Sequence, residues 1–502
     1  MKIATYLSKN RFLLIGILLL IFLRIPSLFE PMWYVDEGMY ATISRHLNNG
    51  YNLYTEIYDH KPPLLFYIYA LLGDDQILFK ARLVNILLGI ISIIGIFAFA
   101  KKYFSPRVAK TAFLFSAVLL GSPIIEGNIA NAENFFLPLT IWGSYFALSN
   151  NKKIIFLAGT MFGIAFMIKF HPLLTLCAVL FYYLLSDFNK RKQLLQKLMP
   201  ICLGFLVPIL ITAILLILSG DLVSFIDAAY LDAFRYAGEI QSGNLIGQIL
   251  QSTVFKTGML IFALGLIFIQ FKRNRISKQT LLIISLLVFE LYAVFLSGRA
   301  YYHYFLQAVF SISIFLAIYM LRIRQANLQH QLVQMLALFG VVISVFYYFN
   351  NLSWRDYKRE NRSLPDNLFA IEYYTNFLSY LGGQKDSASY NSFFGPEAEK
   401  AEILNQSLSD ENRNLYIYAD YAWAYVAAEK FSPTRIFVAF QIFYSREYRE
   451  QTINEIEQKQ VEYIVAEKGR HKFKELRELL AKDYSLSFEN MYFEYYQKSR
   501  LD

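Results

Sequence analysis

Two adjacent acids, Asp36 and Glu37, lie in the run Trp33–Gly38, directly after the first strongly apolar segment of the chain. Acidic side chains beside a bilayer are costly unless they line a wet cavity or take part in a reaction. A carboxylate in such a position can act as a general base and take the proton from an acceptor hydroxyl. The pair therefore indicates an enzyme that works at a membrane surface.

Basic side chains in later loops could complete such a site. Transfer of a sugar from a lipid phosphate needs a base for the acceptor and cations that hold the phosphate and absorb its growing charge. The residue types of this chain suit that reaction, although the sequence does not prove that they meet in one cavity. The basic candidates are His60, Lys61, Arg82, Lys169, His171, Arg299 and His303, and Glu133 is a further acid.

Long apolar runs must position these residues. The chain has 502 residues, of which 56% are hydrophobic, and its mean hydropathy is +0.35. Stretches of about 20 apolar residues are long enough to cross a bilayer as helices. The pattern predicts a polytopic α-helical membrane protein with about 11 transmembrane helices. The expected spans are 11–29, 79–100, 108–126, 134–149, 154–170, 172–186, 198–218, 254–271, 279–297, 303–322 and 331–350.

The distribution of charge predicts how these helices are oriented. The formal net charge is +9, but most basic residues flank apolar runs, so we expect membrane lipids and not nucleic acid as neighbours. If the N-terminus is cytoplasmic, the basic clusters all fall on the cytoplasmic side, as in loops 101–110 and 190–197. The first loop, at about 30–78, and the C-terminus then lie outside the cytoplasmic membrane.

The first outer loop has features of its own. Met39, Ile43 and Leu47 have the i, i+4 spacing of one helical face, so a helix along the membrane surface is expected after Asp36, which could also cap it. The prolines of Tyr58–Pro63 predict a stiff turn. Leu64–Leu72 is apolar but about half the length of a span, which predicts an interfacial or re-entrant helix.

Residues 1–350 thus form the predicted transmembrane domain, and residues 351–502 form an extracytoplasmic α/β domain. Helix-like segments are expected there around 422–430, 445–458 and 471–482. We expect this domain to recognise the acceptor or to cover the active site. It contains no glycine-rich phosphate loop and no Cys/His cluster with metal-ligand spacing. Strand-like runs are Leu415–Ala419, Arg435–Phe440, Val461–Ala466 and Met491–Tyr495.

Four segments carry a resemblance to a known family. Trp33–Tyr40 and Tyr58–Leu64 resemble the first-loop signature of the GT-C glycosyltransferases, in particular the branch with protein O-mannosyltransferases and lipid A aminoarabinose transferases. Ala132–Pro138 resembles the second acidic loop of that family, and Gly298–Leu306 resembles its later Arg/His motif. The resemblance covers about residues 10–350 and not the C-terminal domain.

The resemblance implies a substrate class and a role for each matching residue. Members use polyisoprenyl-phosphate sugars, such as undecaprenyl or dolichyl carriers, and usually invert the anomeric centre. By resemblance, Asp36 activates the acceptor hydroxyl and Glu133 orients the acceptor or the donor sugar. Glu37 is a further catalytic candidate. The implied substrate-binding residues are His60, Lys61, Arg82, Asn134, Lys169, Arg299, Tyr302 and His303, among which Lys61, Arg299 and His303 would hold the phosphate.

No cofactor is expected. Some relatives use a divalent metal, but the first loop of this chain has no Asp-x-Asp motif, and we therefore predict a metal-independent enzyme. The expected partners are the lipid-linked sugar donor and a lipid, glycan or protein acceptor. Three other functions remain open: a glycan ligase or polymerase with a lipid-diphosphate donor, a transporter, and an exporter or scaffold whose exterior domain binds a partner. A transporter would place charges near the bilayer midplane and show matched halves, and neither feature is evident.

Overall fold

The computed structural model describes residues 11–188, 190–232, 252–297, 301–323, 369–408 and 414–499. The chain divides into two compact units built from interleaved pieces. We call Met1–Leu28, Arg82–Thr212 and Ala237–Tyr374 the helical unit. We call Phe29–Ala81, Ala213–Tyr236 and Thr375–Asp502 the α/β unit.

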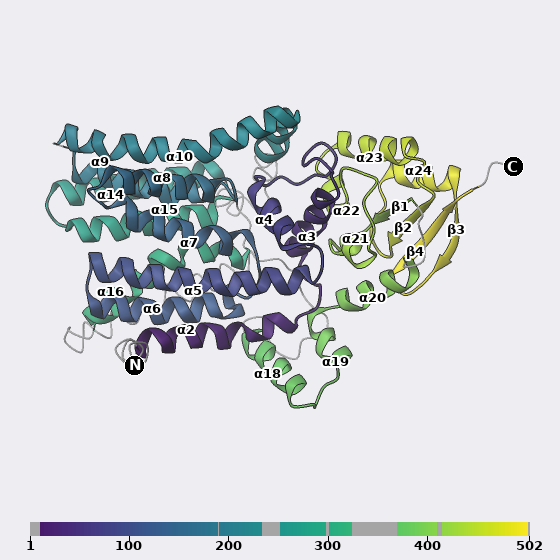
Figure 1. Cartoon of the computed structure of the whole chain (residues 1–502), viewed down its shortest axis with the longest axis horizontal. Helices are drawn as coiled ribbons and strands as arrows, with labels where there is room; N and C mark the ends of the chain where they lie inside the picture. The colour runs from purple at the N-terminus through teal and green to yellow at the C-terminus, as the bar shows by residue number, and fades with distance from the viewer. Residues whose placement is uncertain are drawn as a thin grey trace. The chain divides into compact units, whose positions relative to one another are not determined.

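The helical unit is a bundle in which α2 packs on α6, α6 on α16, α7 on α8, and α15 on both α9 and α14 (Figure 1). Helices are the natural form of such apolar runs, because a helix satisfies its own backbone polar groups in a medium without water. The helices are α2 (Arg11–Arg24), η1 (Ile25–Phe29), α5 (Ile77–Tyr103), α6 (Pro106–Gly121), η2 (Pro123–Ile125), α7 (Ala132–Ala147), α8 (Lys152–Phe166), α9 (Pro172–Ser186), α10 (Arg191–Ser219), α14 (Thr253–Lys272), α15 (Lys278–Leu296), η4 (Tyr302–Ala308) and α16 (Val309–Ile323), with η1, α5 and α10 continuing into the α/β unit.

These helices confirm a multi-pass membrane protein. Six segments of the described chain are long and apolar enough to cross a bilayer: Arg11–Phe29, Ile77–Tyr103, Arg191–Ser219, Thr253–Lys272, Lys278–Leu296 and Tyr302–Arg322. The expected spans between residues 108 and 186 coincide with shorter helices, α6 to α9. The expected span 331–350 lies outside the described residues.

Close backbone packing holds α8 against α10. A Cβ atom added at Gly159 would overlap the carbonyl oxygen of Ile201, and one added at Gly204 would overlap that of Phe156. Small residues let membrane helices approach closely where no hydrophobic effect drives them together. The two glycines therefore fix this helix pair by shape.

The α/β unit contains a four-stranded sheet of order β1-β2-β4-β3, in which β1 and β2 are parallel and the other pairs are antiparallel. Leu415 pairs with Tyr463, and Tyr463 with Gln497, which sets the register of β1, β2 and β4. The strands are β1 (Leu415–Tyr418), β2 (Tyr463–Glu467), β3 (Tyr484–Glu489) and β4 (Phe493–Lys498), and the helices are α3 (Val35–Asn48), α4 (Leu64–Leu72), α11 (Leu222–Ile226), the π-helical turn η3 (Asp227–Asp232), α18 (Phe369–Leu381, which begins in the helical unit), α19 (Ser387–Asn391), η7 (Ser392–Phe394), α20 (Glu397–Leu408), α21 (Ala424–Ala427), α22 (Ala439–Ile442), α23 (Arg446–Gln458) and α24 (Lys474–Asp483).

One strand prediction in this unit, 435–440, was wrong, and one strand was not predicted. Residues 435–438 are not in a strand, although 436–438 are buried, and α22 begins at Ala439. The backbone there serves other partners, since Arg435 O accepts from Tyr58 N and Ala439 N donates to Ala419 O. Strand β3 was not predicted, because α24 leads into it at Tyr484 without a glycine or proline between them (Figure 1). The helix expected after Asp36 is α3, and the short helix expected at 64–72 is α4, so both are confirmed as helices.

The first loop packs into the C-terminal part of the α/β unit. The indole nitrogen of Trp423 donates to Tyr34 O at 2.9 Å, and Thr42 Oγ1 donates to Ala422 O at 2.9 Å. A Cβ atom at Gly38 would lie 2.6 Å from the Trp423 ring, so the helix surface must be bare there. A domain boundary at residue 350 would therefore separate segments that pack against each other. Residues of the C-terminal segments support α3, the helix that carries Asp36.

A buried histidine makes a second connection between α3 and the C-terminal segments. His46 is fully buried, its Nδ1 lies 2.7 Å from Thr42 O, and its Nε2 lies 2.7 Å from Ser432 N. A ring between a carbonyl and an amide N–H is neutral, donating through Nδ1 and accepting through Nε2. Burial lowers the pKa of His46 to about 4.

Candidate active site

Asp36 lies in the first turn of α3 and does not cap it. The helix begins at Val35, and the preceding residue, Tyr34, makes no side-chain capping hydrogen bond. The carboxylate of Asp36 is partly exposed, with 25% of its side-chain surface accessible. A negative charge in a first helical turn is favoured by the helix dipole. The structure thus offers a partly solvated carboxylate on a firmly held helix, as a general base needs.

Lys61 reaches this carboxylate from the stiff turn that follows. Its ammonium lies 3.4 Å from Asp36 Oδ1 and 3.6 Å from Asp59 Oδ1. The same ammonium lies 5.2 Å from the centre of the Tyr40 ring, in a cation–π arrangement. We call Asp36, Asp59 and Lys61 the first-loop cluster. It brings together the predicted base and a predicted phosphate-binding cation.

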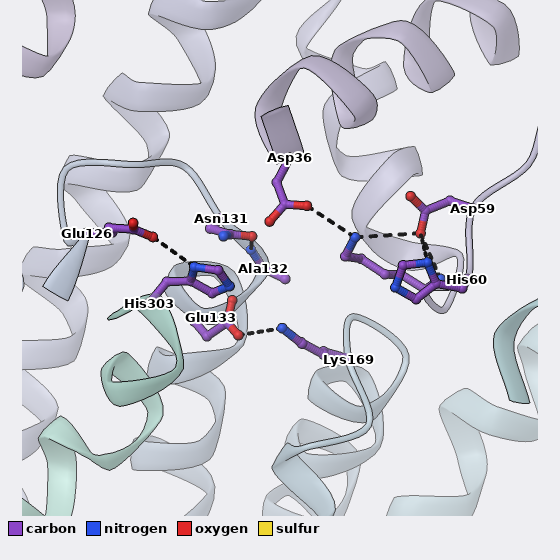
Figure 2. A network of polar contacts seen from close by, with 10 residues as sticks. Asp36, Asp59, His60, Glu126, Asn131, Ala132, Glu133, Lys169 and His303 are labelled. Carbon is purple, nitrogen blue, oxygen red and sulfur yellow. Dashed lines mark hydrogen bonds and ion pairs between the residues drawn. The ribbon is translucent and has the colours of Figure 1, made fainter. Parts of the chain in front are cut away.

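Two further predicted residues flank the first-loop cluster. His60 lies with Nδ1 3.8 Å from Asp59 Oδ1, and its side chain is 18% exposed (Figure 2). Glu37 is fully buried within α3, whereas its neighbour Asp36 is partly exposed. Adjacent residues on a helix point to different faces, so the two acids have different surroundings. The geometry favours Asp36 over Glu37 as the acid that meets a substrate.

The helical unit holds a second group of predicted residues. Glu133, in the first turn of α7, pairs with Lys169 at 2.5 Å (Figure 2). The Glu133 side chain is 1% exposed and that of Lys169 is 11% exposed, so the pair is nearly dry. The Lys169 ammonium also lies 4.6 Å from the centre of the Tyr304 ring. Both residues were predicted site members, and the structure shows that they form an ion pair with each other.

His303 lies near this pair in the same unit and contacts a different acid. Its Nδ1 is 2.8 Å from Glu126 Oε2 (Figure 2). Its ring stacks on Tyr301 with 5.3 Å between ring centres. Glu126 has φ +58°, a left-handed conformation that is uncommon for residues other than glycine. Uncommon backbone conformations that persist often mark functional positions. We call Glu126, Glu133, Lys169 and His303 the helical-unit cluster.

His171 provides a further buried ring beside the helical-unit cluster. Its Nδ1 is buried and has no hydrogen-bond partner among the described residues. Burial, together with the nearby Lys169 ammonium, lowers the pKa of His171 to about 3, so the ring is neutral at pH 7. A neutral ring can accept or donate one proton but cannot supply a cation for a phosphate. Lys169 and His303 are better placed for that role.

Two predicted binding residues serve the fold where the structure describes them. Arg82 is fully buried, and its Nη1 donates to Ser27 O at 2.9 Å. Asn134 is also buried, with Nδ2 donating to Ile129 O at 2.8 Å and Oδ1 accepting from Arg24 at 3.3 Å. Such contacts tie helix ends together. The proposal that Arg82 or Asn134 touches substrate is therefore weaker than for the two clusters.

The remaining two predicted residues are near the start of η4. Tyr302 is the first residue of η4 and is half-buried, next to His303. Arg299 lies outside the described residues. The predicted site thus falls into two groups, the first-loop cluster in the α/β unit and the helical-unit cluster in the other.

Asp59 and Glu126 were not predicted as site members. Asp59 is next to His60 and Lys61, in a motif already selected, so its position was the available signal. Glu126 lies 177 residues from its partner His303, and no local pattern connects the two. Among the described residues, no group of three or more His, Cys, Asp and Glu side chains is arranged to hold a metal ion.

Comparisons with known proteins support the fold. Residues 60–217 match the family described as dolichyl-phosphate-mannose-protein mannosyltransferase. The crystal structure of ArnT from Cupriavidus metallidurans bound to undecaprenyl phosphate is similar over 98% of each chain, with 12% identity and a TM-score of 0.58. The apo oligosaccharyltransferase of Archaeoglobus fulgidus is similar over 91% of this chain and 69% of that chain, with 13% identity and a TM-score of 0.50. No curated protein matches the chain.

Proposed function

Because the chain is a multi-pass membrane protein with the GT-C fold, we propose that it is an inverting glycosyltransferase with a polyisoprenyl-phosphate sugar as donor. The acceptor is a hydroxyl group of a lipid, a glycan or a protein. The observation that carries this proposal is the Asp36–Lys61 pair, with 3.4 Å between ammonium and carboxylate. A base next to a cation is the minimum that the reaction requires.

The proposed reaction is a single displacement at the anomeric carbon of the sugar. Asp36 takes the proton of the acceptor hydroxyl while the hydroxyl oxygen bonds to the anomeric carbon. The bond from that carbon to the phosphate oxygen breaks, and its electron pair stays on the polyisoprenyl phosphate. Lys61 lies beside Asp36 and would stabilise the growing negative charge. Attack from the face opposite the phosphate inverts the anomeric configuration.

The helical-unit cluster supports the same chemistry. Lys169 and His303 are cations or potential cations held by Glu133 and Glu126, and such pairs can exchange a carboxylate for a phosphate. We propose that Lys169, His303 and Arg299 contact the donor phosphate, and that Glu133 orients the donor sugar or the acceptor. ArnT from Cupriavidus metallidurans was crystallised with undecaprenyl phosphate, which supports a carrier with one phosphate.

We propose that the reaction occurs on the extracytoplasmic side of the plasma membrane. The basic loops assign the first loop to that side. Direct contacts of Tyr34 and Thr42 with residues 422–423 require the first loop and the C-terminal segments to share one side. An impermeant thiol reagent should label a cysteine placed at Thr55, in the first loop, in intact cells. Labelling there only after lysis would reverse the orientation.

The proposed reaction is independent of metal ions. Turnover should survive EDTA and should not rise when Mg²⁺ or Mn²⁺ is restored. A loss in EDTA that either ion reverses would replace this part of the proposal with a metal-assisted reaction.

The function is tested by incubating purified protein in detergent with a panel of undecaprenyl- and dolichyl-phosphate sugars, with and without candidate acceptors. Release of free polyprenyl phosphate is the expected result. Release from a lipid-diphosphate donor alone would support a glycan ligase or polymerase. Absence of both release and binding of polyprenyl phosphate would favour a transporter. The panel also identifies the sugar.

A further inference from the structure

Asp59 is a buried acid that the proposed reaction does not use. Its side chain is fully buried, next to an ammonium that already has a carboxylate partner, Asp36. One of its oxygens, Oδ2, is buried and has no hydrogen-bond partner among the described residues. A buried carboxylate oxygen without a partner costs free energy, so a fold that keeps one needs a reason.

The other oxygen of Asp59 fixes the position of Lys61. Asp59 Oδ1 accepts the backbone N–H of Lys61 at 2.9 Å, the two-residue reach of an Asx turn. On the other side of the same residue, Tyr54 Oη donates to Lys61 O at 2.8 Å. Tyr54 is itself fully buried and has φ +76°, a conformation that is uncommon for residues other than glycine. Both backbone polar groups of Lys61 are therefore held by buried side chains.

Asp59 also lies near the Lys61 ammonium, which thus has two carboxylates beside it. The ammonium lies 3.4 Å from Asp36 Oδ1 and 3.6 Å from Asp59 Oδ1, and both distances exceed the 2.7–2.9 Å or so of a strong charge-assisted hydrogen bond. A tight one-to-one pair between Lys61 and Asp36 would stabilise the carboxylate and make it a poorer base. The second carboxylate therefore shares the ammonium with Asp36.

We propose that Asp59 is a positioning residue that holds Lys61 and keeps its ammonium from pairing tightly with Asp36, so that Asp36 stays basic and Lys61 stays available to a lipid phosphate. This inference rests on the proposed function for the role of Asp36 as the base. Its binding part concerns any lipid monophosphate that Lys61 contacts.

Two substitutions separate position from charge. Asp59→Asn keeps an oxygen that can accept the Lys61 N–H but removes the negative charge. Asp59→Ala removes both. Asp75→Asn is the matched control, since Asp75 is an exposed acid of the same unit. All three are made in the full chain.

Binding of undecaprenyl phosphate is the first measurement. Asp59→Asn should bind this lipid as tightly as wild type or several-fold more tightly, because one negative charge near Lys61 has gone. Asp59→Ala should bind it several-fold more weakly, because Lys61 loses the acceptor that places it. The gain in Asp59→Asn should vanish in a Lys61→Met background. Weaker binding by Asp59→Asn, or an equal gain without Lys61, would overturn the inference.

Turnover is the second measurement, made with the undecaprenyl-phosphate sugar that wild type uses. Asp59→Asn should lower kcat by roughly three- to tenfold with KM unchanged or reduced, because Asp36 becomes a weaker base. Asp59→Ala should lower kcat and raise KM. A role in stability alone would move kcat and KM in the same way in both variants, which would contradict the inference. Wild type that binds the lipid but transfers no sugar would reject the proposed function, while the binding results would still decide the role of Asp59.

Discussion

Removing one partner of the Glu133–Lys169 pair should destabilise the protein strongly. The two side chains lie 2.5 Å apart and are 1% and 11% exposed. The second carboxylate oxygen, Glu133 Oε2, is buried without a hydrogen-bond partner among the described residues. Lys169→Met therefore leaves a buried charge with little compensation, a situation that costs about 3–5 kcal/mol in other proteins. Glu133→Gln leaves the ammonium in the same position and should cost a similar amount.

The double variant separates stability from activity. Glu133→Gln with Lys169→Met replaces the pair by uncharged groups of similar size, so most of the lost stability should return. The assay is unfolding of the purified proteins in mixed micelles with increasing SDS, as a double-mutant cycle. The coupling free energy should be at least about 2 kcal/mol, whereas additive effects would refute the view that the pair is a compensated buried unit. All three variants should transfer sugar poorly, because Lys169 and Glu133 are proposed to contact substrate. A stable double variant with wild-type turnover would remove both from the site.

Three further predictions follow from single contacts. His46 has a folded pKa of about 4, below the usual 6.5, so the unfolded chain takes up its proton first. The contribution of His46 to the free energy of unfolding should be complete above pH 6.5 and fall by about 3 kcal/mol as the pH drops to 4. Unfolding titrations of His46→Gln should lack this part of the pH dependence. Gly38→Ala should force its Cβ atom into Trp423 and lower the melting temperature of the purified protein, while the same change at a free helix surface would raise it. Glu126→Gln should weaken undecaprenyl phosphate binding if Glu126 orients His303, and unchanged affinity would show that the 2.8 Å contact does not serve the ligand.

Much of the fold could be predicted because long runs of apolar residues indicate membrane helices. The spans 79–100 and 279–297 match α5 and α15 closely, and the short apolar run at 64–72 is α4. Helix α3 followed from the spacing of its apolar residues. Strand β3 was not predicted because it directly follows α24. The run 435–440 was predicted as a strand because burial and strand propensity both select apolar residues.

The candidate site could be predicted residue by residue but not pair by pair. Asp36 and Lys61 were both selected, yet the sequence did not indicate that Asp59 shares the same ammonium. The contact between His303 and Glu126 could not be predicted from the sequence. It depends on the left-handed backbone conformation of Glu126 and on a fold that brings together residues 177 positions apart. Residue types indicate what chemistry is available, whereas partners depend on tertiary packing.

Asp36 is proposed as the base of a glycosyl transfer from a lipid phosphate. The most direct test compares wild type with Asp36→Asn for turnover of a polyprenyl-phosphate sugar and for binding of undecaprenyl phosphate. In Asp36→Asn, kcat should fall by about 10²–10⁴-fold, the usual contribution of a general base, while lipid phosphate binding persists. Near-normal turnover by Asp36→Asn would contradict the account.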